Sequence, residues 1–150
     1  KIQKVIDLSV FTFSGMLATH SFVIGIGAAR QLMTRPSSPL YEGLEWWILT
    51  MTGDIDWICT IMLIIAIPML SVANKDVKKA GWWLTLIAAF SILAIDAPAQ
   101  LIRTNTWDYL YGSLLALGLI ASLLVPLTPI FKERFPVEEE SQSQPVDSAE

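Results

Sequence analysis

Cysteine and histidine are nearly absent from this sequence, which has one residue of each type in 150. A disulfide within the chain needs two cysteines, so Cys59 excludes a disulfide framework, and we interpret it as a small buried hydrophobe. The single His20 excludes haem ligation by two histidines, and no HExxH, Glu-x-x-His or paired-cysteine spacing occurs. The sequence therefore does not indicate which cofactor, if any, the chain binds.

Charged residues are also scarce, at 16%, against roughly 25% in a typical soluble domain, while hydrophobic residues make up 53%. No basic patch alternates with aromatic residues, which argues against binding of nucleic acid. The net charge of −4 reflects the C-terminal end, where residues 136–150 are rich in Glu, Ser, Gln and Pro. Such a composition buries too little apolar surface to fold. We expect a disordered acidic tail there, after a domain over residues 1–135.

Four long apolar runs fill that domain. A helix rises about 1.5 Å per residue and the hydrocarbon core is about 30 Å thick, so about 20 apolar residues cross it. Hydrocarbon offers the backbone no hydrogen-bond partners, so each run is expected to be helical. We predict an all-α membrane protein with four transmembrane helices in an antiparallel bundle, at about residues 8–29, 46–73, 80–102 and 107–131.

Lysine and arginine counts predict the orientation of the bundle. Seven of these residues lie on one side of the predicted membrane and three on the other, which places both termini in the cytoplasm. Tryptophans at the starts of three spans fit the headgroup interface. The richer side carries Lys1, Lys4, Lys75, Lys78, Lys79, Lys132 and Arg134, and the other carries Arg30, Arg35 and Arg103.

Four ionisable residues lie inside the predicted spans: His20, Asp54, Asp56 and Asp96. Each costs about 2.5–3.5 kcal/mol on insertion scales, and such residues commonly mark function. Counting residues from the span ends places all four in the outer half of the membrane. One interpretation is a polar site open to the outer face, with Gln100 and Arg103 nearby, that binds a ligand or cofactor. His20, Asp54 and Asp96 are then the candidate metal ligands.

The alternative is a set of hydrogen bonds that only hold helices together. Arg103 follows Asp96 by seven residues, about two helical turns, so the two side chains can pair. Asp54 and Asp56 point about 200° apart on a regular helix, so both cannot face inward unless the helix is interrupted, for example at Gly53. If it is interrupted, residues 57–73 form the crossing and both aspartates lie near water.

Small residues recur at helical spacing and predict close helix contacts. One stripe contains Ser14, Ala18, Ser21 and Gly25, and the fourth span pairs Gly112 with Ala116 and Gly118 with Ser122. Pro98 lies within the third span beside Asp96, where a kink is expected. The sequence leaves open whether the stripes pack within the chain or against another subunit.

These features favour an accessory or structural subunit of a larger membrane complex of respiratory, photosynthetic or oxygenase type, in contact with other membrane subunits. The loops are too short for a catalytic domain, so the chain is expected to be non-catalytic by itself. One alternative is a membrane enzyme or a cofactor or metal binder that uses the outer polar site. Another is a small oligomeric transporter, which the almost purely apolar inner half disfavours.

Overall fold

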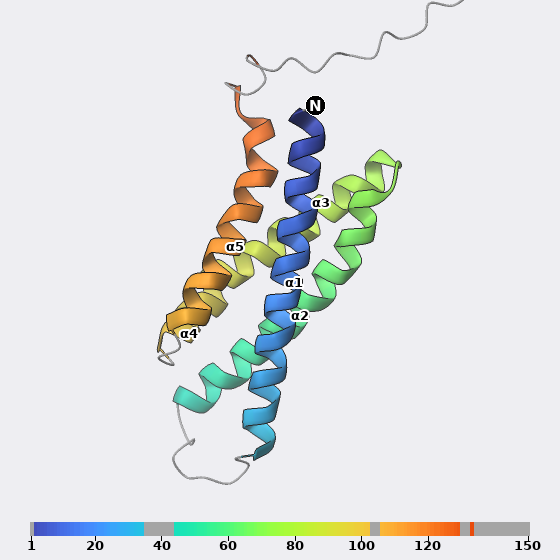
Figure 1. Cartoon of the computed structure of the whole chain (residues 1–150). Coiled ribbons are helices and arrows are strands. Elements are labelled where there is room, and N and C mark those ends of the chain that lie inside the picture. The colour runs from blue at the N-terminus through green and yellow to red at the C-terminus, as the bar shows by residue number, and fades with distance from the viewer. Residues whose placement is uncertain (1, 35–43, 103–105, 130–132, 134–150) are drawn as a thin grey trace, which may run out of the picture.

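The computed structural model describes residues 2–34, 44–102, 106–129 and 133, and every long element in these ranges is a helix (Figure 1). Four helices are long and apolar enough to cross a membrane, over Ile2–Gln31, Thr50–Ser71, Lys75–Ala99 and Leu110–Leu127. The predicted four-span, all-α fold is confirmed. The elements are α1 (Ile2–Thr34), α2 (Leu44–Ser71), α3 (Lys75–Ser91), the π-helical η2 (Ile92–Asp96), α4 (Ala97–Ile102), α5 (Thr106–Leu124) and the 3-10 turn η3 (Val125–Leu127).

The four long helices form a closed bundle in which chain neighbours run in opposite directions (Figure 1). Helix α1 packs between α2 and α5, and α3 packs between the same two helices on the opposite side. Leu17, Leu63, Ile92 and Leu119 are fully buried where these helices meet. The antiparallel arrangement follows the prediction. The orientation in the membrane and the tail over residues 136–150 stay predictions, and the tail lies outside the described residues.

Helix α3 begins five residues before the predicted span. The side chain of Asn74 caps it by accepting hydrogen bonds from the backbone N–H groups of Asp76 (2.9 Å) and Val77 (3.4 Å). Two of the N–H groups that the first helical turn leaves unpaired are satisfied in this way. The cap allows α3 to start directly after α2, with its lysines beyond the apolar run.

The third span widens before Pro98. Proline has no N–H to donate, and its ring collides with the carbonyl four residues earlier, here that of Ala94. The π-helical η2 stands in place of a regular α-helical turn. In it the N–H of Ala97 donates a hydrogen bond to the carbonyl of Ile92, five residues earlier. The disruption expected at Pro98 is therefore a widened turn that ends at Asp96.

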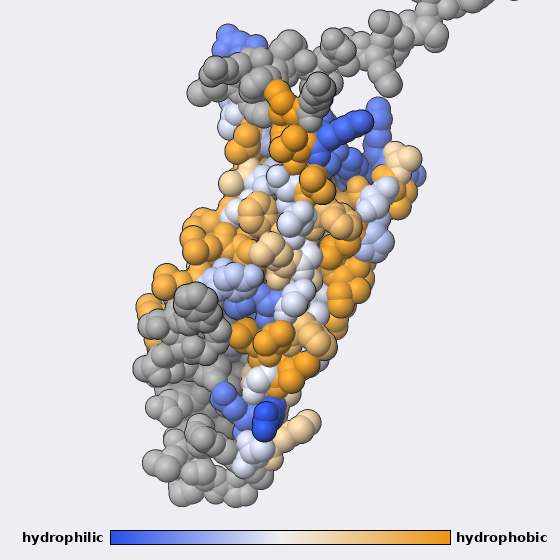
Figure 2. All heavy atoms as spheres, viewed as in Figure 1, coloured by the Kyte–Doolittle hydropathy of each residue, from blue (hydrophilic) through white to orange (hydrophobic). Residues whose placement is uncertain are grey.

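The outward faces of the long helices are apolar. Ile58, Ile64, Leu114 and Trp83 are each more than half exposed, and similar side chains lie along all four spans. Figure 2 shows hydrophobic residues along the flanks of the body, with strongly hydrophilic ones at its upper end and again in its middle and lower parts. Exposed apolar surface of this extent fits contact with the lipid bilayer in a multi-pass membrane protein.

Candidate functional site

Helix α2 continues without interruption through Gly53, so Asp54 and Asp56 point in different directions. Asp56 is completely buried, whereas Asp54 is exposed on the outer surface of the helix. A Cβ at Gly53 would lie only 3.1 Å from the Cβ of Ala28, so this glycine allows α1 to approach α2 closely. The interruption considered at Gly53 is not present, and only one of the two aspartates belongs to the interior.

Asp96 is also buried and lies at the end of η2, which packs against α2. Cys59 follows Asp56 by three residues on α2. Cys59 is itself buried and donates a long hydrogen bond, 3.7 Å, to the carbonyl of Ala88 on α3. The structure therefore buries two of the predicted site residues, Asp56 on α2 and Asp96 on η2, and these two elements pack against each other.

The hydroxyl of Thr60 donates a hydrogen bond of 2.7 Å to the backbone carbonyl of Asp56, one turn earlier on α2. Trp57 points the other way, over Gly25 of α1, where a Cβ would come within 3.3 Å of the indole ring. Its ring also meets Phe22 edge-on, with centroids 5.7 Å apart. Trp57 is thus a packing residue between α1 and α2, which fixes the rotation of α2 that turns Asp56 inward.

His20 lies at a different contact, between α1 and α5. Its ring faces that of Tyr111, with centroids 5.5 Å apart and an interplanar angle of 57°. Its Nε2 occupies the space in which a Cβ of residue 112 would lie, so Gly112 is required to make room for it. Tyr111 and Gly112 are site residues that sequence reasoning missed as partners of His20.

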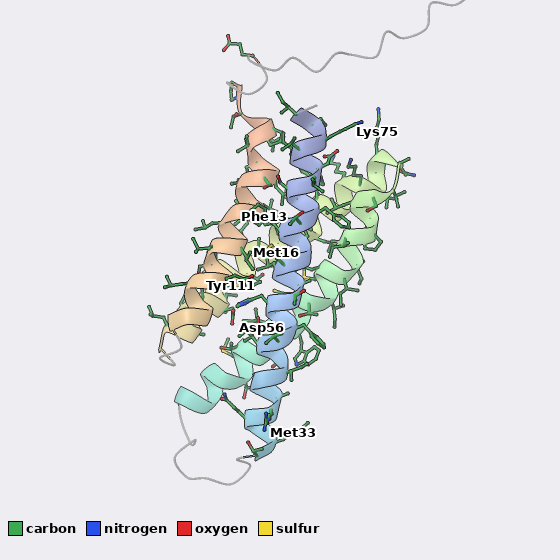
Figure 3. All side chains as sticks on the ribbon, in the orientation of Figure 1. Phe13, Met16, Met33, Asp56, Lys75 and Tyr111 are labelled. Carbon is green, nitrogen blue, oxygen red and sulfur yellow. The ribbon has the colours of Figure 1, made fainter. Side chains whose placement is uncertain are left out.

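Trp57, the chain neighbour of Asp56, contacts α1 at a different position from His20. The Trp57 ring lies over Gly25, five residues beyond His20, which is about 7 Å further along the helix. Figure 3 shows Asp56 nearer than Tyr111 to the end of α1 that carries Met33. The Trp57 contact and His20 therefore lie at different levels of α1.

Buried serine hydroxyls lie on both α1 and α5. In the part of the chain that the structure describes, the Oγ atoms of Ser14, Ser21 and Ser113 are buried and make no hydrogen bond. Ser14 and Ser21 belong to the small-residue stripe predicted on α1, and both are fully buried, as is Ala116 on α5. The stripes therefore pack within the chain.

The remaining candidates are only partly placed. Arg103 lies outside the described residues, and the side chain of Gln100 on α4 does as well, so the predicted pairing of Arg103 with Asp96 stays a prediction.

Within the described ranges, no three His, Cys, Asp or Glu side chains gather in a group that could hold a metal ion. The structure buries Asp56 and Asp96 on the packed elements α2 and η2, and it places the His20 ring against that of Tyr111. Comparison of the chain with protein families, with curated proteins and with solved structures finds no match.

Proposed function

We propose that this chain is a non-catalytic accessory subunit of a larger membrane complex, and that it binds a partner subunit through the outer face of α2. The observation that carries the proposal is the exposed carboxylate of Asp54 inside a candidate membrane span. Ionisable residues in membrane helices usually face the bundle interior and pair with other polar groups. Asp54 instead faces away from its own bundle.

The surroundings of Asp54 form a regular stripe. Met51, Asp54, Ile58, Ile61 and Ile65 follow one another at alternating spacings of three and four residues, and all five are exposed. This spacing places side chains along one seam of a helix, as in left-handed packing of two helices. A single polar residue in such a seam selects a partner that offers a matching group.

The depth of Asp54 supports the same proposal. It precedes Ser71, the last residue of α2, by 17 residues, which is about 25 Å along the axis. The carboxylate therefore lies at the margin of a hydrocarbon core of about 30 Å, measured from the end of α2 nearest the lysines of α3. A basic or hydrogen-bond-donating side chain of a partner helix would stabilise it there.

The small-residue stripes are already occupied by contacts within the chain. This supports a role of the outer face of α2 in binding a partner. The stripe of α1 is buried within the chain, where Gly25 accommodates Trp57. On α5, Gly118 accommodates the ring of Phe13, and Gly112 accommodates His20. The surfaces left for a partner are therefore rows of large side chains such as the one that contains Asp54.

Replacing Asp54 by asparagine should reduce the partner recovered when the chain is purified from its native membrane in mild detergent. Hydrogen bonds between membrane helices contribute about 0.6–1.7 kcal/mol, so recovery should fall roughly three- to fifteenfold. Quantitative mass spectrometry of the co-purified subunits measures the change.

The matched control is Asp76→Asn, which changes an exposed carboxylate in the first turn of α3, ahead of its apolar run. It should leave partner recovery unchanged. The proposal fails if the wild-type chain purifies alone, or if Asp54→Asn retains its partners as fully as Asp76→Asn does.

The two alternative functions receive unequal support. The burial of Asp56 and Asp96 on the packed elements α2 and η2 favours a site for a polar ligand, and a bound chromophore or metal detected in the purified chain would favour that function instead. Toward the lysine-bearing end, Val10, Leu119 and Leu123 are buried together. This apolar filling disfavours a polar route through the bundle.

A further inference from the structure

A cavity of about 460 Å³ lies at the end of the bundle that carries the α3 lysines. It is formed by the first two turns of α1, the first half of α3 and the end of α5 with η3. Its volume falls in the range of about 300–1,000 Å³ that is usual for sites of small molecules. The lining residues are Gln3, Asp7, Lys75, Lys78, Lys79, Trp82, Trp83, Leu86, Leu123, Leu124 and Leu127.

The two ends of this cavity differ in chemistry. Trp82, Leu86 and Leu123 form an apolar interior, and exposed Trp83 and Leu127 continue the apolar surface outward to where lipid is expected. Three lysines of the first turns of α3 surround the other end. At the same end of the bundle, Figure 2 shows strongly hydrophilic residues beside hydrophobic ones.

Lysines outnumber acidic residues among the described residues that line the cavity. Lys75, Lys78 and Lys79 are spaced by three and four residues and so share one face of α3. Among the described residues that line the cavity one is acidic, Asp7, whose carboxylate lies 3.5 Å from the Lys78 ammonium. Both side chains of this pair are more than a third exposed, so the attraction is weak and leaves Lys78 available to a stronger anion.

We propose that this cavity binds an anionic phospholipid, with an acyl chain against the tryptophans and leucines and the headgroup phosphate at the three lysines. Basic pockets between membrane helices recognise acidic headgroups, each lysine near the surface contributing about 1 kcal/mol. A free phosphate ion would leave the apolar walls without a partner. The acidic tail, residues 136–150, offers charge but too few apolar side chains to fill the interior.

The test reconstitutes the full chain in nanodiscs that contain equal amounts of phosphatidylglycerol and phosphatidylcholine of matched acyl chains. Native mass spectrometry after transfer to detergent then counts the lipids that remain bound. The wild-type chain should retain phosphatidylglycerol at least about tenfold more than phosphatidylcholine. The triple variant Lys75→Gln, Lys78→Gln and Lys79→Gln should lose this preference, and Leu127→Trp, which fills the apolar end, should lower retention of both lipids.

The control variant Lys4→Gln with Arg30→Gln removes two positive charges that do not line the cavity and should change nothing. All substituted positions are on the surface, so the variants should fold as the wild type does. Equal retention of the two lipids by the wild type would overturn the proposal, as would a preference that survives the triple lysine variant. Complete displacement of the lipid by inorganic phosphate would show a free-anion site instead. A tenfold rise in retention after deletion of residues 136–150 would show that the tail is the native occupant.

Discussion

Replacing Gly81 by leucine should lower the free energy of unfolding of the bundle by about 2–3 kcal/mol, because this position lies directly against the backbone of α2. A Cβ at Gly81 would lie 3.0 Å from the Cβ of Met69, 3.2 Å from the carbonyl oxygen of Ala66 and 3.3 Å from the backbone nitrogen of Leu70. Two of these atoms belong to the main chain and cannot move aside as the end of a side chain can. A larger side chain must therefore push α2 and α3 apart.

The matched control is Gly15→Leu on α1, where a Cβ would meet no atom within 4 Å. Leucine has the higher helix propensity at both positions by up to about 1 kcal/mol, so the difference between the two variants reports packing alone. Gly15→Leu should be neutral or slightly stabilising. Unfolding in mixed micelles of sodium dodecyl sulfate and a mild detergent, followed by circular dichroism, measures both variants. Equal stability of the two would show that α2 and α3 do not approach closely at Gly81.

The four spans could be predicted from the sequence because hydrophobic length is a local property of each run. The ends of the helices could not, because hydrogen bonding and capping decide them. Helix α1 extends from Ile2 to Thr34, well past the predicted residues 8–29, since a helix need not stop where the hydrocarbon stops. Helix α3 begins early because Asn74 provides a cap.

The candidate site was predictable only in part. The angle of 200° between Asp54 and Asp56 follows from helix geometry, and the structure shows the resulting division between surface and interior. Which of the two faces inward depends on how Trp57 packs over Gly25, a contact between helices that no single segment determines. The position of Asp96 likewise depends on a π-helical turn, which Pro98 alone does not predict.

Gly81 illustrates the same limit for packing. The stripes predicted from small residues did not include it, although Thr85 and Ala89 follow it at spacings of four residues and are buried on the same helix. Its role depends on Ala66, Met69 and Leu70, which come from another helix. Short sequence spacings identify glycines that share a helix face, whereas a close approach is a property of two helices together.

The second large effect is expected at the α1–α5 contact, where Gly112→Ala should destabilise the bundle by about 1–3 kcal/mol. The new methyl group would overlap with the Nε2 atom of His20. The His20 ring is 92% buried and packs against Tyr111, so it cannot swing away without opening the contact between the helices. Thermal unfolding in detergent, followed by the circular dichroism of the helices, measures the loss.

A double-mutant cycle with His20→Ala separates this overlap from a general effect of alanine. Removal of the ring leaves space for the methyl group, so the double variant should be more stable than the sum of the two single effects by about 1–3 kcal/mol. Gly27→Ala, at a position where a Cβ meets nothing within 4 Å, should instead combine with His20→Ala additively. Coupling at Gly112 would show that His20 occupies a packing position between α1 and α5. Additive effects within about 0.5 kcal/mol at both glycines would show that the ring lies elsewhere, and a role of His20 in binding a ligand with Asp56 would then regain support.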